Sequence, residues 1–128
     1  MSATNFSLAN KTKSTLPSVP FAKIKDFALG KSYDLSLSFI GNSTSQKLNR
    51  DFRGKNKPTN ILSFELGKKS GEIFIAPNVV KKQTKTFNRS YKNLLAFLFI
   101  HGLMHLKGME HGSKMEKAEE KIRVKFGI

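Results

Sequence analysis

Apolar residues recur along the chain with two different periods, and the period indicates whether a segment is a strand or a helix. From Tyr33 to Ile40 apolar side chains alternate with polar ones, which predicts a half-buried strand. From Tyr91 to Leu106 the sequence is apolar on nearly every side, so we expect a helix in the interior. The other expected elements are, in chain order, a strand at 5–9, a helix at about 21–29, a helix that Ser43 or Thr44 caps and that ends near Gly54, strands at 61–66 and 72–76, a helix that opens at Asn78, and a helix at 115–126.

This order of elements predicts an α+β fold, with a mixed sheet of about four strands packed with helices and a central histidine-bearing helix. The length of 128 residues favours a single domain over residues 1–128. Hydrophobic residues make up 38% of the sequence and charged residues 25%, a balance that supplies a core and excludes disorder over most of the length. We expect the phenylalanines at positions 52, 64, 74, 87 and 97 to lie in that core, and only Phe87 is a candidate for stacking on a nucleic-acid base.

Positive charge dominates the composition. Lys and Arg number 23 against 9 Asp and Glu, so the formal net charge of +14 favours RNA, DNA or an anionic membrane surface as a partner. Two basic stretches fit either a track for phosphate groups or a solvated surface, and the sequence leaves both interpretations open. The first stretch holds Lys47, Arg50, Arg53, Lys55 and Lys57, and the second holds Lys81, Lys82, Lys85, Arg89 and Lys92. The last helix, in which Glu116, Glu119 and Glu120 are interspersed with lysines, is expected to be a solvated face.

The chain contains no cysteine, which excludes disulfide scaffolds, Cys-ligated zinc fingers, iron–sulfur clusters and cysteine nucleophiles. Its most apolar run, Leu94 to Ile100, is far shorter than the roughly 20 residues of a membrane-spanning helix. The first 23 residues are polar and lack the apolar core of a signal peptide. We therefore expect a cytoplasmic protein without a membrane partner.

The three histidines, His101, His105 and His111, lie within eleven residues of one another. On a helix, positions four apart share a face, so His101 and His105 can direct two imidazoles at one ion. Gly108 can end the helix and turn the chain, which would bring His111 back as a third ligand and leave the fourth tetrahedral position for water. The alternative is that these are ordinary core or surface histidines. Zinc proteases carry a general-base glutamate next to the first histidine, and Gly102 occupies that position here, which argues against a peptidase.

Two segments carry a resemblance to a known family. His-Gly-x-x-His-Leu-x-Gly-x-x-His runs from His101 to His111, and Leu-Asn-Arg-Asp-Phe-Arg-Gly-Lys-Asn-Lys-Pro-Thr-Asn-Ile-Leu-Ser-Phe runs from Leu48 to Phe64. Together they resemble the YbeY family of metal-dependent bacterial endoribonucleases, which are involved in ribosomal RNA maturation. The resemblance covers about residues 48–126. Asn60 and Glu72 stand where the family usually has Asp. At position 60 this chain therefore lacks the carboxylate that could act on the metal ligands from behind.

The resemblance implies a zinc-dependent endoribonuclease that is specific for single-stranded RNA. It would act in ribosomal RNA maturation, at the 3′ end of the small-subunit RNA, and in ribosome quality control, with single-stranded RNA, ribosomal RNA and the ribosome as partners. One Zn²⁺ per chain, or another divalent transition metal, would be held by His101, His105 and His111. Catalytic roles fall to Arg53 and His101, and substrate-binding roles to Arg53, Lys55 and Lys57. A guanidinium suits the phosphate role because it remains charged and binds phosphate with two parallel hydrogen bonds.

A second interpretation comes from a different functional class. The chain could be an assembly factor that binds RNA or the ribosome through its positive charge, with a three-histidine metal site that is only structural. Cleavage products would support the enzyme, and retention of intact RNA would support the binding factor.

Overall fold

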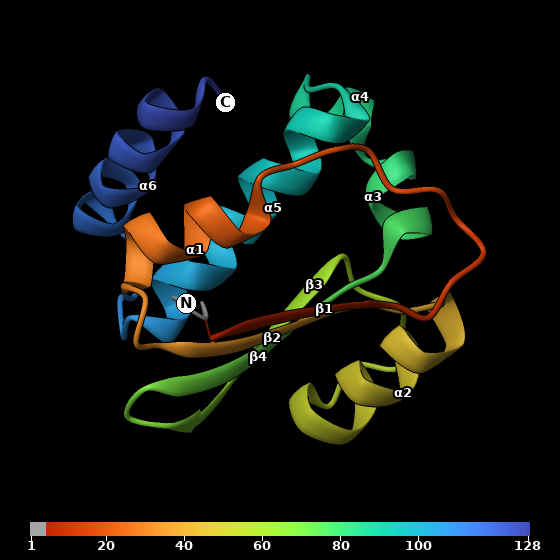
Figure 1. Cartoon of the computed structure of the whole chain (residues 1–128). Helices are drawn as coiled ribbons and strands as arrows, with labels where there is room; N and C mark the ends of the chain where they lie inside the picture. Colours follow the sequence, from red (N-terminus) through yellow and green to blue (C-terminus); the bar gives the residue numbers. More distant parts are fainter. Residues whose placement is uncertain (1–4) are drawn as a thin grey trace.

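A mixed four-stranded sheet forms the centre of the molecule, as a computed structural model of residues 5–128 shows (Figure 1). The strands are β1 (Phe6–Asn10), β2 (Asp34–Phe39), β3 (Ile61–Gly67) and β4 (Ser70–Ile75), in the spatial order β1-β2-β4-β3. β2 pairs in parallel with both β1 and β4, whereas β3 pairs antiparallel with β4 and forms one edge of the sheet. The structure therefore confirms the α+β class and the mixed sheet.

Six helices accompany the sheet in the described part of the chain. They are α1 (Phe21–Leu29), α2 (Asn42–Arg53), α3 (Pro77–Lys82), α4 (Thr84–Phe87), α5 (Tyr91–Leu106) and α6 (Ser113–Phe126). Figure 1 shows α1, α5 and α6 on one side of the sheet and α2 on the other. This arrangement leaves the edge strand β3 between α2 and α5.

Helix α5 is the centre of the core, as its pattern predicts. Ten of its sixteen residues are buried, and the buried positions lie on more than one face. Gly102 allows α5 to approach the sheet closely, because a Cβ atom there would lie 2.8 Å from Ser63 Oγ and 2.9 Å from Ile61 Cδ1. The absence of a side chain at Gly102 thus sets the distance between the histidine helix and β3.

Several sequence-based expectations differ from these elements: α4 was not expected as a separate helix, and the last helix begins at Ser113. Helix α2 begins at Asn42 with Gly41 in the extended conformation at its N-cap and no side-chain cap, so neither Ser43 nor Thr44 caps it. Helix α3 begins at Pro77 rather than Asn78, because proline suits the first turn of a helix, where no N–H is needed. None of the five phenylalanines expected in the core is fully buried: Phe52 is 67% exposed, and Phe64, Phe74, Phe87 and Phe97 are half-buried.

No helix within residues 5–128 is long and apolar enough to cross a membrane.

Candidate metal centre and cationic cleft

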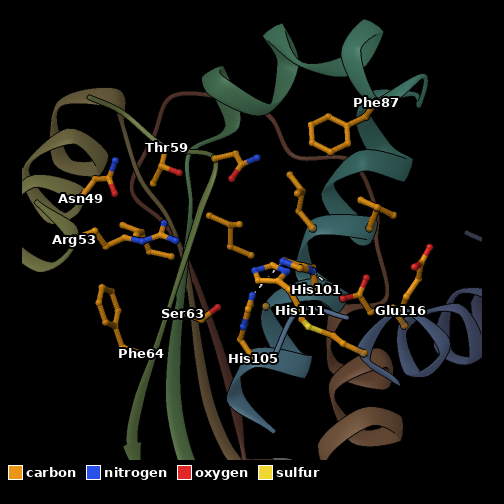
Figure 2. A pocket seen from close by; sticks show the side chains of 18 of the residues that line it. Asn49, Arg53, Thr59, Ser63, Phe64, Phe87, His101, His105, His111 and Glu116 are labelled. Atoms are coloured by element: carbon orange, nitrogen blue, oxygen red, sulfur yellow. Dashed lines mark hydrogen bonds and ion pairs between the residues drawn. The ribbon is translucent and has the colours of Figure 1, made fainter. Parts of the chain in front are cut away.

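The three histidines converge at the C-terminal end of α5. His101 and His105 lie one turn apart on that helix, and their Nε2 atoms are 3.1 Å apart. Gly108, with a φ of 87°, follows the helix and allows the turn that returns His111 to the same point. The ring centroids of His111 lie 5.2 Å from His101 and 4.8 Å from His105, so all three rings face one position (Figure 2).

The spacing of these imidazole nitrogens fits a metal ion. One nitrogen from each ring lies within 4.8 Å of the other two. A tetrahedral zinc ion with bonds of about 2.05 Å to nitrogen holds its ligand nitrogens roughly 3.3 Å apart. The pair His101 and His105 has about that separation, and His111, which is exposed, keeps its ligand nitrogen within 4.8 Å of both. Three neutral imidazoles are a donor set that suits Zn²⁺ and other divalent transition metals.

Glu119 of α6 contacts the histidine cluster through His101. His101 Nδ1 donates a hydrogen bond of 2.7 Å to Glu119 Oε2, which leaves Nε2 with its lone pair directed at the other histidines. Glu119 is 7% exposed, and its other oxygen lies 3.6 Å from Arg123 Nη1. The expectation that Glu119 lies on a solvated helix face is therefore wrong.

Burial keeps His105 in the form that binds metals. Desolvation lowers the pKa of His105, and the nearby His101 and His111 lower it further, while Glu119 acts in the opposite direction. A lowered pKa means that the imidazole is neutral at pH 7 and has a free lone pair.

Helix α2 and the loop after it bring three residues of the first basic stretch, Arg53, Lys55 and Lys57, to the same region. Arg53 is the last residue of α2, and Gly54 in the left-handed conformation (φ 69°) ends the helix there. Two buried polar residues of α2 fix the loop: Ser45 Oγ donates to the Thr59 carbonyl at 2.7 Å, and Asn49 Nδ2 donates to the Lys57 carbonyl at 2.9 Å. Sequence reasoning missed both, since a buried Ser and Asn on a polar helix carry no pattern of their own.

One cleft of about 1130 Å³ joins these two regions. Figure 2 shows Arg53 on one side of β3 and the histidines on the other side of that strand, with Ser63 between them. Among the described residues, five cationic side chains and two carboxylates line the cleft: Arg53, Lys55, Lys57, Arg89 and Arg123 against Glu116 and Glu119. The cleft is therefore positively charged, and it is larger than most pockets for small molecules.

The structure separates the second basic stretch into two parts. Arg89 is half-buried and lines the cleft, whereas Lys81, Lys82, Lys85 and Lys92 do not line it. Asn60 also lines the cleft, and its amide donates to Gln83 Oε1 at 2.9 Å. Position 60 thus carries a neutral side chain, whose hydrogen bond joins the residue before β3 to the residue before α4.

The comparisons with known proteins agree with this geometry. A family model described as "Endoribonuclease YbeY" matches residues 4–126. The chain belongs to the YbeY family. A protein named Endoribonuclease YbeY from Francisella philomiragia is 32% identical over 149 aligned residues, which cover all of this chain and 94% of that relative. The YbeY relative from Mycoplasmopsis synoviae is 42% identical over 105 residues, covering 74% of this chain and 68% of its own.

The fold of this YbeY-family chain is also similar to a solved structure. The solution structure of a Thermotoga maritima protein matches with a TM-score of 0.63 and 22% identity, over 91% of this chain and 85% of that one. At this identity the likeness concerns the fold alone.

Proposed function

We propose that this protein is a metal-dependent endoribonuclease that cleaves single-stranded RNA. The observation that carries the proposal is the position of the three-histidine cluster in a cleft lined by an excess of positive side chains. A nuclease needs both features: a group that activates the attacking oxygen and cations that offset the charge of the phosphodiester. The relatives named Endoribonuclease YbeY support the choice of RNA as substrate.

The residues have separate roles in this proposal. His101, His105 and His111 hold the metal ion, for which Zn²⁺ is our choice, with one ion per chain. Such an ion is a Lewis acid that makes water ionisable near neutral pH and polarises phosphoryl oxygens. Glu119 orients His101, and His101 accordingly contributes to catalysis as a ligand.

Arg53 binds the phosphodiester on the opposite wall of the cleft. Its guanidinium offers parallel hydrogen bonds to two phosphate oxygens and stabilises the charge that grows on them in the transition state. Lys55 and Lys57 follow Arg53 in the loop that α2 fixes, and they hold the neighbouring backbone of the RNA as point charges.

Single-stranded RNA suits the cleft better than duplex RNA. His101 is only 27% exposed in its side chain, so the phosphodiester has to enter the cleft to reach it. A single strand can bend and splay its bases to do this, whereas a base-paired duplex presents a stiff, regular surface. We extend the proposal to cytoplasmic maturation of ribosomal RNA, at the 3′ end of the small-subunit RNA, and to ribosome quality control, with the ribosome as partner, because of the family resemblance.

Product analysis tests this function. The metal-loaded protein is incubated with an end-labelled single-stranded RNA and, separately, with the same RNA annealed to its complement. We expect internal cleavage of the single strand with defined phosphate ends and little cleavage of the duplex. Retention of intact single-stranded RNA without any fragments would instead favour the binding factor with a structural metal site.

A further inference from the structure

A second group of cations lies in the cleft, at a place that the proposed chemistry does not use. The guanidinium carbon of Arg89 lies 4.0 Å from the centre of the Phe97 ring, and that of Arg123 lies 5.3 Å from the same centre. Arg89 comes from the residues just before α5, and Arg123 comes from α6. Tertiary packing therefore places both arginines against one aromatic ring, and the charge of Arg123 is felt at Arg89.

The charge of this pair is incompletely balanced by its surroundings. Arg89 Nη1 donates a hydrogen bond to the neutral amide oxygen of Asn93. Arg123 lies 3.6 Å from Glu119, but that carboxylate also accepts the hydrogen bond of His101. Burial lowers the pKa of Arg89, and the positive charge of Arg123 lowers it further, so both effects disfavour its charged form. An anion between the two arginines would relieve this repulsion.

The position of the pair relates it to the metal centre. Phe97 precedes His101 by four residues on α5, which is about one helical turn, or roughly 5.4 Å along the axis. Arg89, Phe97 and Arg123 line the same cleft as the histidines. Figure 2 shows Phe87 and Arg53 on different sides of the histidines. The ring centre of Phe87 is 6.0 Å from that of Phe97, so Phe87 indicates the side on which Phe97 lies. The arginine pair thus extends the cleft away from Arg53.

We propose that Arg89 and Arg123 form a second phosphate subsite, which binds an RNA phosphodiester one or two nucleotides from the bond that is cleaved. This inference rests on the proposed function, since it assumes an RNA strand in the cleft. The strand then passes from Arg53, across the histidines, to the arginine pair. Cation–π contacts with Phe97 restrict both guanidinium groups, so less side-chain freedom is lost when they bind phosphate.

The experiment measures binding of RNA rather than its cleavage. A short, fluorescein-labelled single-stranded RNA of mixed sequence is titrated by anisotropy in the presence of a chelator, so that the RNA remains intact. Arg89→Gln removes one charge in the cleft. Lys121→Gln is the matched control, because Lys121 is exposed on α6 and does not line the cleft. Thermal melting of both variants checks that they fold.

We expect Arg89→Gln to weaken binding roughly tenfold, as for loss of a charge-assisted hydrogen bond, and Lys121→Gln to weaken it by less than about twofold. The slope of log K against log salt should fall by about 0.7 for Arg89→Gln, the value for one phosphate contact on a single strand. If Arg89→Gln does not fold, Arg89→Lys takes its place, with an expected loss of about threefold because it keeps the charge without the planar fork.

A set of RNAs, each with one neutral methylphosphonate linkage, then identifies the phosphate that is bound. At one position the neutral linkage should weaken binding by the wild type but not by Arg89→Gln, while the linkage bound by Arg53 should matter to both proteins. The subsite is wrong if no linkage shows this coupling, or if Arg89→Gln binds like Lys121→Gln. If the wild type neither binds nor cleaves RNA, the proposed function itself fails, which is a separate result.

Discussion

Arg53 is the residue whose role is most easily separated from that of the metal. It lies at the end of α2, across β3 from the histidines, so its truncation leaves the metal ligands untouched. We expect Arg53→Ala to keep its metal and its fold but to cleave RNA roughly 100-fold more slowly, because charge stabilisation in the transition state is lost. Arg53→Lys should restore only part of the rate, since a point charge cannot form the two parallel hydrogen bonds.

The matched control for Arg53 is Arg50→Ala. Arg50 lies one turn earlier on α2, is exposed, pairs with Asp51, and does not line the cleft. Cleavage rates at saturating RNA are compared for the two variants, together with metal content by atomic absorption. Wild-type cleavage by Arg53→Ala would remove Arg53 from the mechanism.

His105 should make the stability of the metal-free protein depend on pH. Burial and the neighbouring His101 and His111 lower its pKa in the folded state, so between that value and about 6.5 the unfolded chain binds more protons than the folded one. The stabilisation is therefore complete above about pH 6.5 and is lost as the pH falls through the folded-state pKa of His105. Thermal melting in chelator should show a lower Tm at mildly acidic pH, and His105→Ala should reduce that dependence. An identical pH profile for both proteins would contradict this cause.

Glu119 should act on the metal through His101. Glu119→Gln keeps a hydrogen-bond acceptor of the same size but loses the negative charge that strengthens His101 as a ligand. We expect metal affinity, measured by competition with a coloured chelator, to fall about 10- to 100-fold while the Tm of the metal-free protein changes little. Glu120→Gln, an exposed neighbour on the same helix, is the control and should bind metal like the wild type. Unchanged affinity in Glu119→Gln would mean that the contact only packs α6 against α5.

At the residue scale, sequence reasoning found what lies close together in the chain. The three histidines could be predicted because His101 and His105 share one helix turn and Gly108 turns the chain before His111. Glu119 was missed because its contact with His101 spans 18 residues and exists only once α5 and α6 pack together. Phe52 was expected in the core because it is apolar, but it is exposed. Its exposure depends on how α2 packs against the sheet, and no local sequence pattern indicates that packing.

At the scale of elements, the contact between α5 and the edge of the sheet is the critical one. An added Cβ at Gly102 would lie within 3 Å of Ser63 Oγ and Ile61 Cδ1, so Gly102→Ala forces α5 away from β3. We expect a loss of about 1–3 kcal/mol in the free energy of unfolding, measured by urea denaturation. Metal affinity should also fall, because the movement shifts His101 and His105 relative to α6.

Gly67→Ala is the control for this element. Gly67 lies in β3, has no atom within 4 Å of an added Cβ, and does not have a left-handed φ. Its substitution should leave the stability within about 0.5 kcal/mol of the wild type. If Gly102→Ala is as stable as Gly67→Ala, the close approach of α5 to β3 is not what holds the two elements together.

The periodic elements could be predicted from sequence, whereas their boundaries depended on local details. Strand β2 and helix α5 were predicted because burial on one or all sides leaves a clear pattern in the sequence. The start of α2 was predicted too late. Ser43 and Thr44 are of the residue types that usually cap helices, but Gly41 in the extended conformation occupies the N-cap position.

At the scale of the whole molecule, the cleft exists because distant segments meet around β3. Arg53 comes from the end of α2, the histidines come from α5 and the loop after it, and Arg123 comes from α6. The net charge of +14 predicted a polyanionic partner but not the location of the charge that matters. All four lysines of the second basic stretch lie outside the cleft lining, and only Arg89, which packs on Phe97, brings that stretch into it.

The most direct test of the central claim is the rate of single-stranded RNA cleavage as a function of metal occupancy. The metal-free protein is titrated with Zn²⁺ while bound metal and cleavage are measured in the same samples, and His105→Ala is treated in the same way. We predict that the rate rises in proportion to occupancy up to one ion per chain, that chelator abolishes it, and that His105→Ala binds metal weakly and cleaves little. Cleavage by the metal-free protein at the rate of the loaded protein, or full occupancy without any cleavage, would contradict the account.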